Sequence, residues 1–126
     1  MPTKRTGGRA ERRIVVSYLD GTWTDSLAVA DYGMSYEAGE LTLAIDVAPH
    51  GPRGHAPRAA LRDFCARLGH IGTLQIGKAD LAAQLRERMK VLDRPRIDVE
   101  LRGGGRSFRY PAGVVFGPDE VTINLG

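Results

Sequence analysis

The sequence has a single cysteine, Cys65, and no long apolar run. One cysteine cannot form a disulfide within the chain, so the fold must depend on an ordinary hydrophobic core. A chain of 126 residues can bury one such core, which predicts one domain. No segment approaches the ~20 apolar residues of a membrane-spanning helix, and the first residues lack the apolar segment of a secretory signal. We therefore expect a cytoplasmic protein that does not bind membranes.

Several common site motifs are also missing. The chain contains no G-x-x-x-x-G-K-[ST] loop, no G-x-G-x-x-G and no G-x-S-x-G. These patterns would place phosphates on backbone N–H groups or expose a nucleophilic serine. Without them, the sequence favours a non-catalytic protein, and we expect no cofactor.

Positive charge is missing from residues 14–52, which contain six acidic residues and no Lys or Arg. Residues 1–13 have five basic groups and one acid, and residues 53–109 have 13 basic groups and six acids. Residues 1–12 also lack an apolar pattern, which predicts a flexible basic arm followed by a single α+β domain over residues 13–126. Opposite charges on different segments can attract each other within one fold or between subunits.

Alternating apolar residues predict strands near both ends of this domain. The clearest case is ELTLAIDV, residues 40–47, in which every second side chain is apolar. Apolar residues at helical spacing predict helices from about 57 to 68 and from about 79 to 91. The predicted order is three strands, a helix, a short strand, a helix and three strands. This order favours an α+β fold: a mainly antiparallel sheet of about six or seven strands, with two central helices packed on one face.

Glycines predict where these elements turn or end. Asp20-Gly21 is typical of a hairpin turn, and Ala38-Gly39 and residues 103–105 are expected to turn the chain in the same way. Gly33 suggests a break in the second strand. Gly69 is suited to ending the first helix.

Three histidines lie close to the cysteine in the sequence, at His50, His55 and His70. The spacing matches no common zinc pattern, in which ligand pairs are two to four residues apart. Cys65 also belongs to the apolar side of the predicted helix, and His70, five residues later, points about 140° away from it. We therefore expect a core cysteine and loop histidines, with no metal site and no Cys–His catalysis.

Asp98 and Glu100 lie on one face of the predicted strand RIDVELR, about 6.5–7 Å apart along the strand. Divalent-metal nucleases present acids in this way, followed by a basic residue such as Arg102. The same spacing occurs on the polar face of any half-exposed strand. A metal-dependent enzyme is therefore a third hypothesis, and the sequence names no third acid for it.

Arginine occurs together with glycine in three places, at residues 4–13, 51–58 and 102–106. Glycine lets backbone N–H groups approach an anion, and arginine adds a charge with two parallel donors. The second of these segments leads into a helix N-terminus, where unpaired N–H groups favour anions. The residues expected to contact an anion or nucleic acid are Lys4, Arg5, Arg9, Arg12, Arg13, Arg53, Arg58, Arg102 and Arg106.

A winged helix is an alternative for the middle of the chain. In that arrangement the hairpin at 96–110 is the wing and the second helix, with its basic residues, reads a groove. The first third of the chain is strongly β and does not belong to that plan.

We therefore expect a non-catalytic binding protein, whose basic arm and Gly/Arg loops contact nucleic acid or an acidic protein surface. The alternative is a structural subunit of a viral or secretion-type particle, in which the arm holds a neighbouring subunit. Both hypotheses predict a homo-oligomer or a larger assembly, because the segments of opposite charge can attract each other.

Overall fold

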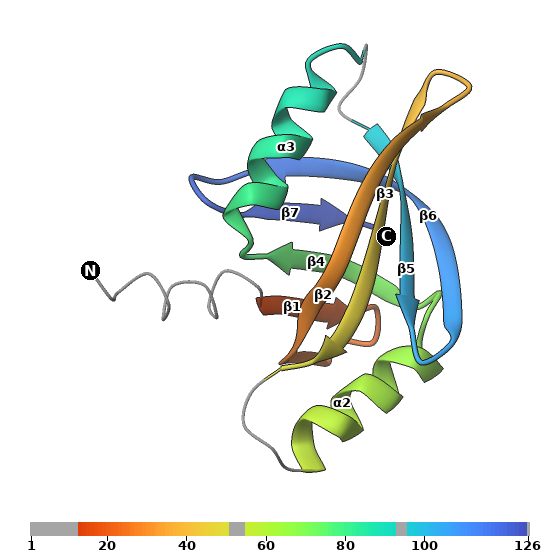
Figure 1. The fold of residues 1–126 in the computed structure, drawn as a ribbon. Coiled ribbons are helices and arrows are strands. Elements are labelled where there is room, and N and C mark those ends of the chain that lie inside the picture. The colour runs from red at the N-terminus through yellow and green to blue at the C-terminus, as the bar shows by residue number, and fades with distance from the viewer. Residues whose placement is uncertain (1–12, 51–54, 93–95, 126) are drawn as a thin grey trace.

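The computed structural model describes residues 13–50, 55–92 and 96–125, in which the chain forms seven strands and two helices (Figure 1). The strands are β1 (Arg13–Tyr18), β2 (Trp23–Glu37), β3 (Glu40–Pro49), β4 (Ile71–Ile76), β5 (Arg96–Gly103), β6 (Arg106–Phe116) and β7 (Val121–Asn124). The helices are α2 (His55–Ala66) and α3 (Ala79–Met89). The predicted order of strands and helices is confirmed. Residues 1–12, predicted as a flexible arm, lie outside the described residues.

The strands close into a barrel in the order β1-β2-β3-β5-β6-β7-β4. Closure occurs because β4 pairs with both β1 and β7, so no strand in the ring is left with a free edge. Neighbouring strands are antiparallel except β3 and β5, which are parallel and are connected through α2, β4 and α3. The mainly antiparallel sheet is therefore confirmed.

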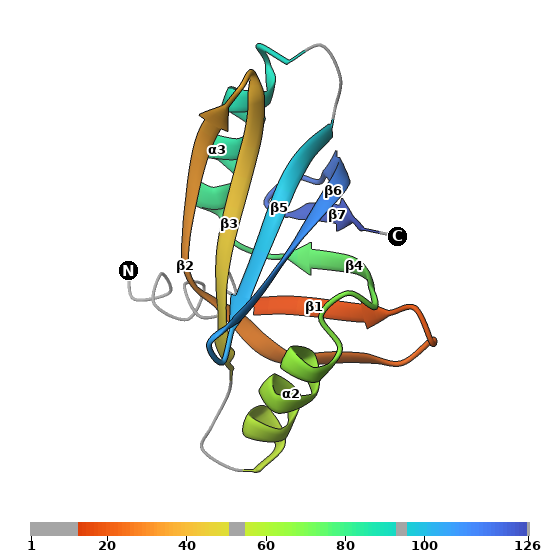
Figure 2. The same cartoon turned by 90° about the vertical axis from the view of Figure 1, so that its right-hand side faces the viewer.

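The prediction that two central helices pack on one face of the sheet is wrong, because the sheet closes into a barrel. α2 and α3 lie at separate places on the barrel, α2 near the β5–β6 turn and α3 near the far end of the β2–β3 hairpin (Figures 1 and 2). The physical reason is that alternating apolar residues predict which face of a strand is buried, but not which strand pairs with each of its edges.

The barrel interior is the hydrophobic core. The apolar residues of β3 that the alternation predicts, from Leu41 to Val47, point inward with 6% exposure or less. Ile97, Val99 and Leu101 of β5 are buried beside them, and Phe64 of α2 is also fully buried. No helix in the described ranges is long and apolar enough to cross a membrane.

β2 runs without a break through Gly33, contrary to the prediction. Its irregularity lies between Val29 and Asp31, where the register with β3 shifts. The following turn is formed by Ala38 and Gly39, both with positive φ (53° and 84°), as two-residue hairpin turns require. The predicted turn at these two residues is confirmed.

Candidate anion-binding surface

The nine predicted contact residues divide into two groups. Five of them lie outside the described residues: Lys4, Arg5, Arg9, Arg12 and Arg53. The structure places the other four on three elements: Arg13 on β1, Arg58 on α2, and Arg102 and Arg106 on the β5–β6 hairpin. Arg13 lies 3.9 Å from an Asp25 carboxylate oxygen.

α2 presents two arginines along one edge. Arg58 and Arg62 are one helical turn apart and exposed, and Cys65 follows on the same side of the helix. Arg62 was not among the predicted contact residues, although its i, i+4 spacing from Arg58 is a signal that could have found it.

This edge of α2 is joined to the β5–β6 turn. A Cβ built on Gly103 would lie 3.4 Å from Sγ of Cys65 and 3.6 Å from a methyl carbon of Leu61. A Cβ on Gly104 would lie only 2.9 Å from the same Sγ, and Gly104 also has a φ of +56°. The turn therefore packs on the helix at glycines that have no side chain, and the charge of Arg106, which follows the turn, acts on the Cys65 thiol of α2.

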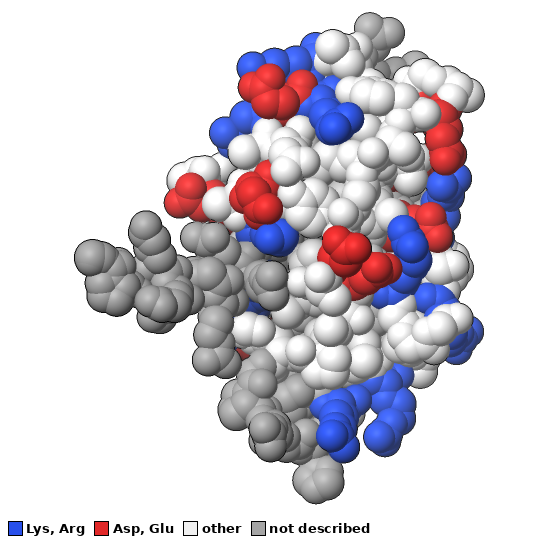
Figure 3. Space-filling model, viewed as in Figure 1, with Lys and Arg blue, Asp and Glu red and all other residues white. Residues whose placement is uncertain are grey.

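Arg58, Arg62 and Arg106 form a surface that we call the basic edge. All three are exposed, and in the described part of the chain none is ion-paired with a carboxylate. Figure 3 shows basic side chains over the α2 end of the molecule, whereas farther along the barrel acidic and basic side chains are interspersed. The basic edge thus leaves guanidinium donors available to an anion.

Arg102 differs from these three because it is already paired. Its Nε lies 3.4 Å from an Asp46 oxygen and 3.8 Å from a Glu100 oxygen. Asp46 and Arg102 are partners in the parallel β3–β5 register. A hollow of about 440 Å³ is lined by Asp46, Arg102 and Arg106 together with the glycine turn, so its charge is mixed.

An ion cluster holds the opposite edge of α2 and keeps the helix in place. The Arg67 guanidinium donates to Asp63 (2.6 and 3.1 Å), to Asp20 (2.8 Å) and to the Thr22 hydroxyl (2.7 Å). Its carbon lies 4.0 Å above the ring of Tyr18. Burial of this ring raises the pKa of Tyr18 to about 12. Four of the five N–H donors of Arg67 are therefore used, and the cluster connects α2 with the β1–β2 turn.

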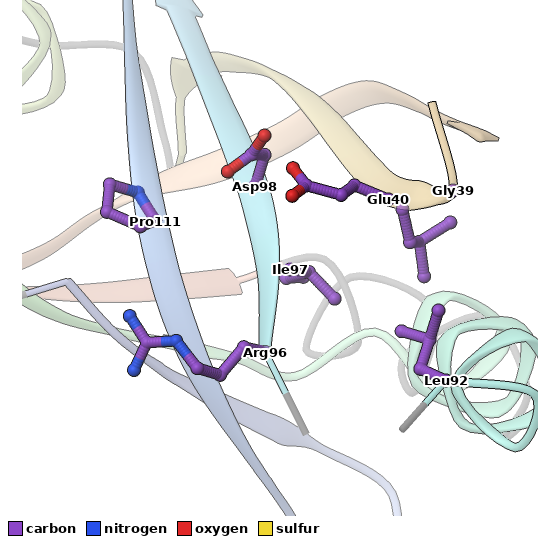
Figure 4. A pocket seen from close by; sticks show the side chains of 8 residues that line it. Gly39, Glu40, Leu92, Arg96, Ile97, Asp98 and Pro111 are labelled. Atoms are coloured by element: carbon purple, nitrogen blue, oxygen red, sulfur yellow. The ribbon is translucent and has the colours of Figure 1, made fainter. Parts of the chain in front are cut away.

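The carboxylates Asp98 and Glu100 have different surroundings. Glu100 lies between two arginines, with an oxygen 3.8 Å from Arg102 and another 3.9 Å from Arg109. Asp98 lines a hollow of about 390 Å³ beside Glu40, a second carboxylate that the strand pattern did not predict (Figure 4). The two acids of the enzyme hypothesis thus have different surroundings, and in the described ranges no three His, Cys, Asp or Glu side chains could hold a metal together.

In the described part of the chain, the cysteine and the histidines form no group of three that could hold a metal, and the His55 side chain lies outside the described residues. Cys65 packs against the core. Burial raises the pKa of its thiol, and the opposing effect of the Arg106 charge is smaller. His70 is exposed beyond the end of α2, and the backbone N–H of His50, just after β3, donates a hydrogen bond to the backbone carbonyl of Ser26 on β2. The prediction that Cys65 belongs to the apolar side of the helix is confirmed.

The described surface therefore contains exposed arginines without carboxylate partners on α2 and beside the glycine turn that packs on it, and α2 is held by packing on one side and by ion pairs on the other. Sequence reasoning identified Arg58 and Arg106 and missed Arg62. Comparisons with protein-family models, with curated proteins and with solved structures find no match to this chain.

Proposed function

We propose that this protein is a non-catalytic binding module that contacts the phosphates of a nucleic acid through the basic edge. The observation that carries the proposal is that Arg58 and Arg62 on α2, and Arg106 beside the turn that packs on α2, are exposed without carboxylate partners. Arg67, Arg102 and Arg109 are all ion-paired. Guanidinium groups bind phosphate oxygens with two parallel hydrogen bonds. The same chemistry serves a carboxylate-rich protein surface, which is the other outcome of the test.

The glycine turn adds to this surface. Gly104 and Gly105 carry no side chain and adopt positive φ, so the backbone at the turn is accessible beside Arg106. Backbone N–H groups and arginines often contact phosphates together.

The proposal predicts a defined dependence on salt. Each phosphate contact to a single strand contributes about −0.7 to the slope of log K against log salt, so three contacts give about −2. Removing two of them should make the slope about 1.4 less steep.

The test measures binding of the full chain to a fluorescent oligonucleotide over a salt series. Arg62→Gln combined with Arg106→Gln should weaken binding at least tenfold at low salt and flatten the slope. The matched control combines Arg88→Gln with Arg96→Gln. These arginines are also exposed but lie on α3 and at the start of β5, away from α2.

Two results would overturn the proposal. One is an absence of oligonucleotide binding by the wild-type protein at low salt. The other is an equal loss of binding in both double variants, because that would show a dependence on net charge alone. Binding to a polyglutamate peptide but to no oligonucleotide would identify an acidic protein surface as the partner instead.

A further inference from the structure

An exposed aromatic side chain continues the basic edge. Phe108 follows Arg106 by two residues on β6 and is 43% exposed. Alternate residues of a strand lie on the same face, about 6.5–7 Å apart. The Phe108 ring and the Arg106 side chain therefore extend from the same side of the hairpin.

The ring of Phe108 is fixed by its neighbours. A Cβ built on Gly69 would lie 3.2 Å from a ring carbon of Phe108, so the ring packs closely against the bare backbone there. Gly69 has a φ of +100°, which favours glycine at this point. The ring of Tyr110 lies 4.7 Å away, and its hydroxyl accepts a hydrogen bond from the Gly69 N–H. The ring is therefore held in place while much of it stays exposed to solvent.

The order of these groups follows α2. Arg58 and Arg62 are about 6 Å apart along the helix axis. The β5–β6 turn contacts Cys65, about one helical turn beyond Arg62, and Phe108 packs at Gly69, which follows the end of the helix. Arg58 and Arg62 thus follow each other along α2, the β5–β6 turn with Arg106 packs at Cys65, and the Phe108 ring packs at Gly69, just beyond the end of the helix.

We propose that the nucleic acid is single-stranded, with a base stacked on Phe108 and with phosphates at Arg62 and Arg106. This inference rests on the proposed function. Bases in a duplex are stacked on each other and paired, so their faces are closed to a side chain, whereas the bases of a single strand can stack on an aromatic ring. An arginine row beside a fixed aromatic ring combines the two elements of single-strand binding, a charged track and a stacking platform.

The experiment compares three ligands of equal length: a single strand, the same strand with every base removed, and a duplex. The wild-type protein should bind the single strand about tenfold more tightly than the abasic strand, which has the same phosphates. Phe108→Leu, which keeps an apolar contact with Gly69, should abolish this difference. Phe108→Tyr should restore it, because the ring is retained.

Tyr36→Leu is the matched control. Tyr36 is 44% exposed, but it lies near the β2–β3 turn, and its hydroxyl donates a hydrogen bond to the backbone carbonyl of Arg88 on α3. This variant should keep the preference for bases. Far-UV circular dichroism and the urea midpoint check that each variant is folded.

The outcomes separate the two proposals. If the wild-type protein binds the intact and abasic strands equally, or prefers the duplex, the single-strand inference is overturned while the phosphate contacts stand. The inference is equally overturned if Phe108→Leu keeps the preference for bases. If none of the three ligands binds at low salt, the proposed function itself fails.

Discussion

The turn between β5 and β6 contains two glycines whose substitution has two different costs. Gly104 and Gly105 both have positive φ, at 56° and 79°. A Cβ on Gly104 would also lie 2.9 Å from Sγ of Cys65, whereas a Cβ on Gly105 meets nothing within 4 Å. We expect Gly105→Ala to lower the free energy of unfolding by about 1–2 kcal/mol, which is the cost of a left-handed backbone for alanine. Gly104→Ala should lower it by about 2–5 kcal/mol, because the thiol must also be displaced.

Urea denaturation of the two variants measures both costs through the transition midpoint and the slope m. Cys65→Ala removes the atom that clashes, so in that background Gly104→Ala should cost no more than Gly105→Ala. Equal costs of the two substitutions in the wild-type chain would refute the reasoning. An unchanged cost of Gly104→Ala in the Cys65→Ala background would refute it too, because the turn would then not rest on α2 at this sulfur.

Two further predictions concern single side chains. Tyr18→Phe should raise the free energy of unfolding by about 1 kcal/mol at neutral pH, because the buried hydroxyl has no hydrogen-bond partner among the described residues. Burial raises the Tyr18 pKa from 10.0 to about 12, so the unfolded chain loses this proton at a lower pH than the folded protein does. The free energy of unfolding should therefore fall as the pH rises from 10 to about 12. Urea titrations at several pH values should show a smaller fall for Tyr18→Phe than for the wild-type protein. Ala38→Asn should raise the thermal midpoint and stabilise the fold by about 0.5–1 kcal/mol, because Ala38 has a φ of 53° and asparagine tolerates this conformation better; an unchanged or lower midpoint would contradict this.

Local patterns were sufficient to predict the elements but not the closure of the barrel. Leu41 to Val47 of β3 and Ile97 to Leu101 of β5 alternate clearly, and the faces predicted to be buried are buried. α2 ends at Ala66, close to the predicted end, and Gly69 follows with positive φ. The parallel pairing of β3 with β5 joins residues more than 50 positions apart. The two strands are not joined by a short turn, so no turn motif in the sequence predicts that they pair.

The candidate surface was also predictable only in part: the sequence pointed to some of its residues but not to their contacts. Arg58 and Arg106 were identified from the glycines near them, which mark turns and a helix start. The pairing of Arg102 with Asp46 could not be predicted, because it depends on the β3–β5 register. The alternation of β6 does not show whether Phe108 is buried or exposed. Its place on the surface is set by the contact of its ring with Gly69, a residue 39 positions earlier in the sequence.

The most direct test of the central claim is the salt dependence of single-strand binding by the Arg62→Gln, Arg106→Gln double variant. The account predicts that the slope of log K against log salt becomes about 1.4 less steep than in the wild-type protein, while the Arg88→Gln, Arg96→Gln control keeps the wild-type slope. A slope unchanged by the first pair, or flattened equally by both pairs, would contradict a phosphate-binding role for the basic edge.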